Sequence, residues 1–276
     1  MKLFLLILLT WMYGPVISQE YYSLPAEAKE IPSNSISFHV GAMYGRSVYN
    51  DRVLQRYSAG VGIGISPEWM ISSSLTFSDL HDEKFIFESV RLTSKYRLIT
   101  SKTKWSQFRL SAFGTVAYSR NHLDYNEINL AGDHSGVQAG LLASHMWKRW
   151  AFSGSASLIE MFSKSRWEKD LPQQYAYEAF NYSVSAGVNI FPLNNKKHSL
   201  AKVNFLAQLI GSSNLDWKYE KYYVDLAPAI QLILNRKVRF YLQHRFQIKS
   251  DIFRLQRNSW VISYEFPLFS DIKKNI

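Results

Sequence analysis

Alternation of apolar and polar residues with a period of two is the feature that most constrains this chain. The stretch 56–65 shows it most clearly: its odd-numbered positions are tyrosine, alanine, valine or isoleucine, and its even-numbered positions are arginine, serine or glycine. In a β-strand, alternate side chains point to opposite sides of the sheet. One apolar face and one small or polar face, repeated along the whole chain, indicate a β-barrel that spans a membrane.

The pattern predicts strands separated by alternating short and long connections. The expected strands are 35–44, 56–65, 69–78, 85–98, 106–119, 136–147, 150–162, 180–191, 200–211, 223–234, 238–249 and 259–269. Their even number places both termini at one end of the barrel. Short turns such as 66–68, 148–149 and 236–237 are then periplasmic, and the long loops 120–135, 163–179 and 212–222 face outside. The expected fold is an all-β, twelve-stranded, antiparallel up-and-down transmembrane barrel over 34–269. A soluble β-sandwich is the alternative.

The first residues have the pattern of a secretory signal peptide. Lys2 precedes the short apolar run 3–9, which Pro15 closes, so the run is too short to span a membrane as a helix. We expect a signal peptide over 1–18, a short periplasmic segment over 19–33, and a C-terminal tail over 270–276.

Composition narrows the class of protein further. The absence of cysteine excludes a disulfide scaffold, a thiolate metal site and a lipid-modified N-terminal cysteine. The formal net charge is +10, but the bases gather in the short connections and most acids in the long ones. This charge polarity is typical of an oriented membrane protein, so no nucleic-acid partner is expected.

Two C-terminal stretches carry a family resemblance. The runs VDLAPAIQLILNRKVRFYLQHRF (224–246) and WVISYEFPLF (260–269) resemble the last three strands of the porin-like outer-membrane β-barrel family of Gram-negative bacteria, whose members often have no assigned function. The resemblance implies export through a cleaved signal peptide and residence in the outer membrane, with outer-membrane lipid as surroundings. It also implies insertion by the barrel assembly machinery, which reads a final strand ending in an aromatic residue, the place of Phe269. The tail 270–276 departs from this pattern.

Catalytic and metal-binding patterns are weak. Barrel phospholipases and deacylases use a His-x-Ser pair on one strand face, and no such pair occurs here. His122 and Asp124 share a face, as barrel proteases require, but no second acidic pair accompanies them. His81, Asp82 and Glu83 are contiguous and cannot easily converge on one ion. We therefore expect no enzyme, no cofactor and no metal.

The face opposite the apolar one carries many bases. Alternation points two acids, Asp225 and Glu265, toward the lumen, together with a larger basic set: Arg91, Lys95, Arg97, Arg109, Lys202, Arg239, Arg245 and Lys249. Buried charges need water, counter-ions or partners. Two interpretations stay open: a polar lumen that favours anions, or an interior filled by loops whose acids pair with the wall.

Pro228 and His244 interrupt the apolar face. Alternation places both outward, yet proline removes a ladder donor and histidine is polar in hydrocarbon. A local bulge that rotates His244 inward is the expected explanation, and a lateral site for lipid or a partner is the alternative.

Three functions remain. The first is a pore for passive passage of small polar or anionic solutes. The second is a non-conducting surface barrel, an adhesin or a structural or secretion-complex component, with an unknown surface or periplasmic protein partner contacting aromatic loops such as 164–179 and 214–224. The third, which the missing His-x-Ser pair disfavours, is a barrel enzyme acting on lipid or peptide.

Overall fold

A computed structural model describes residues 31, 33–81, 84–121, 127–162, 176–192, 201–215, 222–234 and 238–269. Within them it contains twelve strands: β1 (Ser35–Ser47), β2 (Val53–Gly64), β3 (Trp69–Ser78), β4 (Ile86–Lys102), β5 (Ser106–Ser119), β6 (Gly136–Trp147), β7 (Trp150–Met161), β8 (Glu178–Pro192), β9 (Ala201–Asn214), β10 (Tyr222–Leu234), β11 (Val238–Ser250) and β12 (Gln256–Phe269). No helix in this described part of the chain is long and apolar enough to cross a membrane.

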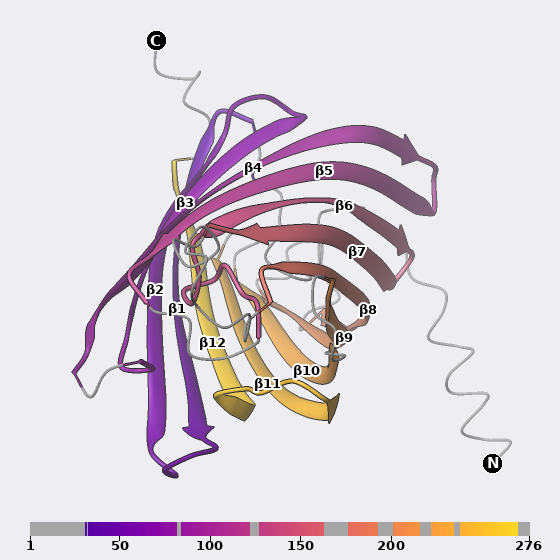
Figure 1. Ribbon diagram of the computed structural model, residues 1–276. Helices are drawn as coiled ribbons and strands as arrows, with labels where there is room; N and C mark the ends of the chain where they lie inside the picture. Colours follow the sequence, from indigo (N-terminus) through magenta and orange to yellow (C-terminus); the bar gives the residue numbers. More distant parts are fainter. Residues whose placement is uncertain are drawn as a thin grey trace, which may run out of the picture.

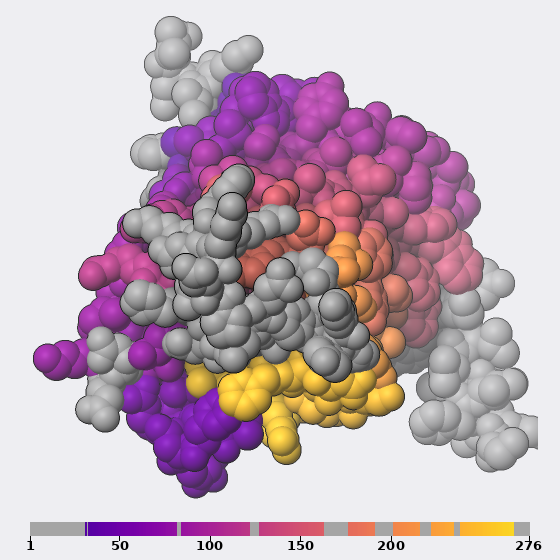
Figure 2. All heavy atoms as spheres, viewed as in Figure 1, coloured from indigo at the N-terminus to yellow at the C-terminus, as the bar shows by residue number. Residues whose placement is uncertain are grey.

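The strands form one closed antiparallel barrel in sequence order. Each strand pairs with its neighbours along the chain, and β1 closes the ring by pairing with β12, with Val40 opposite Tyr264 (Figure 1). In the space-filling view, the indigo and purple β1–β2 region lies directly beside the yellow C-terminal strands (Figure 2). The predicted all-β, twelve-stranded up-and-down barrel is confirmed. Closure leaves no unpaired sheet edge, which a strand-built membrane protein requires.

The two faces of the wall differ as the alternation predicts. Outward side chains are apolar and exposed, for example Leu92 (52% exposed), Val116 (53%) and Val184 (62%). Inward positions on the same strands are small or polar, such as Ser111, Thr115 and Ser185, and they are buried. An exposed apolar belt around a polar interior is the arrangement of a transmembrane barrel.

Strand ends follow the predicted ranges closely. The bounds of β3, β5 and β6 coincide with the expected 69–78, 106–119 and 136–147, whereas β4 continues to Lys102 and β12 begins at Gln256. Residues 1–30, 82–83, 122–126, 163–175, 193–200, 216–221, 235–237 and 270–276 lie outside the described residues, and with them the expected signal peptide and tail.

The barrel has a short-turn end and a long-loop end. Residues 65–68, 103–105 and 148–149 connect strands at the short-turn end, where β1 begins and β12 ends. Residues 120–135 and 251–255 connect strands at the opposite end, which we call the long-loop mouth.

The expected bulge at Pro228 is absent from β10 and β11, and that prediction is wrong. Leu226 pairs with Phe246 and Ala229 with Gln243, so the register is the same on both sides of Pro228. His244 therefore stays on the outer face. It lies opposite Trp260, and the two rings stack with centroids 4.4 Å apart.

Candidate functional site

The segment 127–135 between β5 and β6, here called the mouth loop, folds against the inner wall at the long-loop mouth (Figure 1). Ile128 and Leu130 are almost fully buried and form one apolar cluster with residues of β5, β7 and β8: Ala117, Ile159, Met161 and Ala179, together with Ala176. Ser119 and Ser135 tie the base of the loop, because the Ser119 amide donates to Ser135 Oγ at 2.8 Å. One side of the mouth loop is thus packed on the wall.

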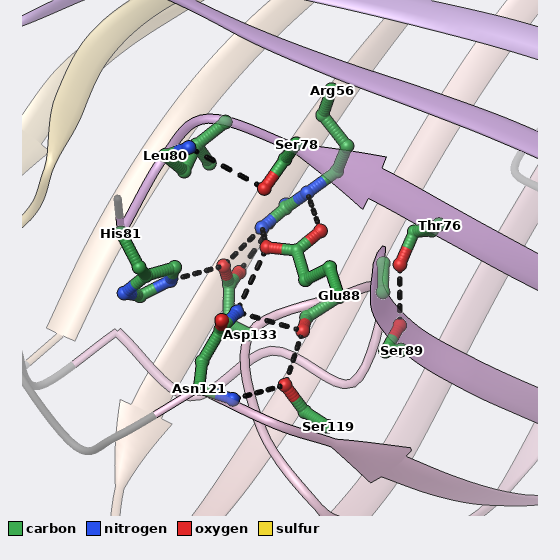
Figure 3. Close-up of polar contacts among 12 residues, drawn as sticks. Arg56, Thr76, Ser78, Leu80, His81, Glu88, Ser89, Ser119, Asn121 and Asp133 are labelled. Carbon is green, nitrogen blue, oxygen red and sulfur yellow. Dashed lines mark hydrogen bonds and ion pairs between the residues drawn. The ribbon is translucent and has the colours of Figure 1, made fainter. Parts of the chain in front are cut away.

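A first ion cluster anchors the loop to β2 and β4 (Figure 3). The Arg56 guanidinium donates to both oxygens of Glu88, at 2.7 and 2.6 Å, and also to the Asp133 carboxylate of the loop. All three side chains are buried. His81 Nε2 lies 3.4 Å from Asp133 Oδ1, and Asn121 donates to Glu88 at 2.9 Å. Paired geometry of this kind is what makes buried charge tolerable.

Gly132 allows the loop to approach this cluster. Its φ of +148° lies in a region that side-chain-bearing residues rarely adopt, and a Cβ there would lie 2.6 Å from Glu88 Oε2 and 2.7 Å from Arg56 Cζ. Its carbonyl accepts a hydrogen bond from Ser119 Oγ at 2.7 Å. Only glycine can adopt this φ and also fit against Glu88 and Arg56 without a shift of the surrounding atoms.

The loop carries two titratable groups with displaced pKa values. Burial alone would raise the pKa of Asp133, but the Arg56 guanidinium and the His81 hydrogen bond outweigh it and hold that pKa well below its ordinary value. Burial lowers the pKa of the neighbouring His134, and the Asp133 charge offsets this only in part. At neutral pH, Asp133 is therefore ionised and His134 is neutral.

His81, Glu88 and Asp133 each offer one potential metal-ligand atom, and these atoms lie within 4.8 Å of one another. Arg56 also lies among them and pairs with both carboxylates. These side chains therefore form a buried ion-pair cluster, in which the Arg56 guanidinium occupies the position that a metal cation would need.

A second ion cluster anchors the opposite side of the loop to β10 and β11. Arg254 donates to Glu127 of the loop at 2.8 and 3.0 Å and to Asp225 at 2.8 Å. Arg245 reaches the same two acids, with Nε 2.6 Å from Asp225 Oδ2. The Tyr223 ring lies against both guanidiniums, 4.2 Å from Arg254 Cζ and 5.4 Å from Arg245 Cζ. The two clusters and the apolar contact together hold the loop across the mouth.

The predicted basic wall lies mostly on the inner face, where Arg97, Arg109, Lys202 and Arg239 lie toward the short turns, Lys95 near the middle of β4, and Arg91 closer to the long-loop mouth, opposite Ala117. Arg91 is opposite Ser74, Lys95 opposite Phe113 and Arg97 opposite Ser111, all inward partners on β3 or β5. Arg109 lies near the start of β5, and Lys202 on β9 is opposite the buried Ile233. Arg239 lies 3.6 Å from Glu265.

The structure places two predicted wall residues differently. A register shift between Val224 and Asp225 sets Lys249 opposite Val224, on the strand face that points away from the lumen. Lys249 is exposed there, with Nζ 5.1 Å from the Tyr222 ring centroid. Arg245 does point inward, but it is neutralised by Asp225 and Glu127.

Sequence reasoning missed the residues that close the mouth. In the sequence, Arg56 is one of several polar positions in 56–65, and Glu127 and Asp133 are two of the acids in the long connection 120–135. Glu88 and Arg254 were not singled out. The alternation in β2 does place Arg56 inward, which was the one available signal.

One histidine of the mouth loop has a structural place, and the catalytic and metal-binding candidates of the sequence lie largely outside the described residues. His134 is buried in the loop, with Nδ1 3.2 Å from the Asn129 carbonyl oxygen, and serves the loop's own conformation. His122, Asp124, Asp82 and Glu83 lie outside the described residues.

Comparisons with known proteins agree with this fold. No family model and no curated protein matches the chain. Among solved structures, an outer membrane channel from Pseudomonas putida F1 is similar over 89% of this chain and all of its own length, with a TM-score of 0.58 and 9% identity. The NanC porin matches over 84% of this chain and 99% of its own, with a TM-score of 0.49 and 12% identity. OprD from Pseudomonas aeruginosa matches over 85% of this chain and 65% of its own, with a TM-score of 0.41 and 10% identity.

The likeness to the Pseudomonas putida channel shows the fold class: this chain folds as an outer-membrane-type transmembrane β-barrel. At 9% sequence identity, the comparison supports a shared fold and no more.

Proposed function

We propose that this protein is a channel of the Gram-negative outer membrane that passes small polar or anionic solutes, and that the mouth loop narrows its long-loop end. The short turns then face the periplasm and the barrel assembly machinery inserts the chain. The similar Pseudomonas putida barrel is described as an outer membrane channel, which supports this class of function.

The segregation of charge along the barrel axis is the observation that carries the proposal. At the long-loop mouth, Glu88, Asp133, Asp225 and Glu127 meet Arg56, Arg245 and Arg254 in two ion clusters. Away from these clusters, the described strands direct more bases than acids into the lumen, and Glu265 is the acid that they place near the short turns. Arg97, Arg109, Lys202 and Arg239 lie toward the short turns, Lys95 lies near the middle of β4, and Arg91 lies closer to the mouth. A wall with this excess of positive charge raises the local concentration of anions.

The loop contacts explain how a filled mouth and a conducting lumen can coexist. Loop acids pair with wall arginines, as the alternative of a loop-filled interior requires, but Glu127 and Asp133 do so only at the mouth. The loop therefore sets the width of the entrance, and the basic wall sets the preference for charge.

Swelling of proteoliposomes tests the proposal. Purified protein is reconstituted, and entry of a small organic anion is compared with entry of a neutral sugar of similar size. We expect the anion to enter faster, and we expect Arg91→Gln with Arg109→Gln to remove most of that advantage. Arg46→Gln is the control, since the Arg46 side chain is 69% exposed beyond the lumen. Swelling no faster than in protein-free liposomes would contradict a pore and favour the non-conducting barrel.

A further inference from the structure

Two hairpin ends lie side by side at the short-turn end. The β4–β5 and β6–β7 turns are neighbours in Figure 1, and the Lys148 amide donates to the Trp105 carbonyl oxygen at 3.0 Å. Ser106 pairs with Trp147 across β5 and β6. We call residues 102–106 and 147–150 the indole–lysine rim.

Ammonium groups in the rim rest on indole rings. Lys148 Nζ lies 5.3 Å from the Trp147 ring centroid and 5.8 Å from that of Trp105, and Lys104 Nζ lies 5.2 Å from Trp105. Cation–π contact at these distances holds each ammonium over a ring face. An ammonium has three donors, so those directed away from the ring remain suited to an acceptor such as phosphate.

The rim is exposed and strongly basic. Trp105 and Trp147 are 45% and 42% exposed, although each is large and apolar. Lys102 and Arg149 add two further cations at the same turns. The sequence contains no acid from 89 to 123 or from 134 to 159, and the acid on the described short turns is Glu68, between β2 and β3. The positive charge of the rim is thus not balanced within its own hairpins.

We propose that the indole–lysine rim binds the headgroup phosphate of anionic glycerophospholipid, with phosphatidylglycerol as the representative ligand. Indole rings favour the headgroup level of a bilayer, where lysine stems lie along apolar surface and their ammoniums reach lipid phosphate. A headgroup with net negative charge meets the rim's cations without the competing cationic group of a zwitterionic lipid. With the short turns in the periplasm, the rim contacts the leaflet built from glycerophospholipid.

Native mass spectrometry of the refolded full-length protein in micelles tests this binding. Short-chain phosphatidylglycerol, phosphatidylcholine and phosphorylated lipid A are each titrated against wild type, Lys104→Gln with Lys148→Gln, and a control with Arg46→Gln and Lys84→Gln. The control removes two cations from the long-loop end. Each interfacial cation contributes about fivefold to affinity for an anionic surface. We therefore expect phosphatidylglycerol affinity to fall about 25-fold in the rim variant and less than twofold in the control.

Three results would overturn the proposal. These are equal affinity of wild type for phosphatidylglycerol and phosphatidylcholine, an equal loss in both double variants, and tighter rim binding of phosphorylated lipid A than of phosphatidylglycerol. Heat-modifiable gel migration verifies that each variant is folded. If the double variant does not fold, the single variants replace it, each with an expected loss of about fivefold. Lys104→Arg with Lys148→Arg should retain the binding, because it retains both charges.

Discussion

Individual buried charges decide the conformation of the mouth. Glu88 and Asp225 are fully buried, and each is held by arginine through more than one hydrogen bond. Removing one partner of such a pair leaves an uncompensated charge in a place with little water. The mouth loop therefore stays docked only while the guanidiniums and carboxylates are all present and ionised.

Arg56→Met should release the loop. Without the guanidinium, Glu88 and Asp133 face each other as buried anions, and loss of one partner of a buried pair costs about 3–5 kcal/mol. We expect faster hydrogen exchange over 127–135 and a larger single-channel conductance. Arg46→Met is the matched control, because its pair with Asp51 is exposed and such pairs contribute about 0–1 kcal/mol. Unchanged hydrogen exchange over the mouth loop in Arg56→Met would contradict the role of Arg56 in holding the loop on the wall.

Acidification should also open the mouth. The docked loop lowers the pKa of both Asp133 and His134, so the released loop binds protons more readily than the docked one, and low pH favours release. Docking should weaken as the pH falls below 6.5, the ordinary value for histidine, and weaken further toward 3.8, the ordinary value for aspartate. Conductance recorded from pH 7.5 to 4.5 should rise. His134→Gln should remove the part of that rise just below pH 6.5, and a pH-independent conductance would refute the assignment.

At the scale of elements, the two-residue period predicts the strands, because each strand has one face toward lipid and the other toward the lumen. The β5 strand illustrates this: Leu110 lies on the outer face and Ser111 on the inner, where it is buried. Strand bounds and facing could therefore be predicted from local pattern alone.

Leu110→Arg should impair folding far more than Ser111→Arg. A cationic residue on the lipid face near the midplane costs roughly 2–4 kcal/mol, whereas a lumen position retains polar neighbours. Heat-modifiable gel migration reports the folded fraction of each variant in vesicles. Equal losses would mean that the facing of β5 is reversed.

The contacts of the mouth loop, and the outward facing of Lys249 and His244, could not be predicted from local pattern. Arg56 and Asp133 are 77 residues apart and Glu127 and Arg254 are 127 apart, so no local pattern links them. Lys249 left the predicted lumen set because one register shift in β10–β11 reversed its face. His244 remained outward because stacking on Trp260 accommodates the ring there without a bulge. Such long-range pairs and single-residue register shifts can be identified only in the three-dimensional structure of the closed barrel.

At the scale of the whole molecule, the barrel is polarised: paired acids and arginines gather at the long-loop mouth, and bases predominate toward the short turns. We expect the long-loop mouth to face the cell exterior. The chain lacks cysteine, so single cysteines at Asn50 and Thr103, exposed at opposite ends, report the orientation cleanly. Asn50→Cys should react with an impermeant maleimide on intact cells and Thr103→Cys only after permeabilisation. The reverse pattern would invert the topology.

The reversal potential of the reconstituted barrel under a potassium chloride gradient tests the central claim most directly. A lumen lined by Arg91, Arg109 and their basic neighbours should give an anion-selective potential. This preference should weaken toward 1 M salt, where the Debye length falls to about 3 Å. Arg91→Glu with Arg109→Glu should cancel or reverse the preference while the barrel still inserts. A cation-selective wild type, or a double variant with unchanged selectivity, would contradict the account.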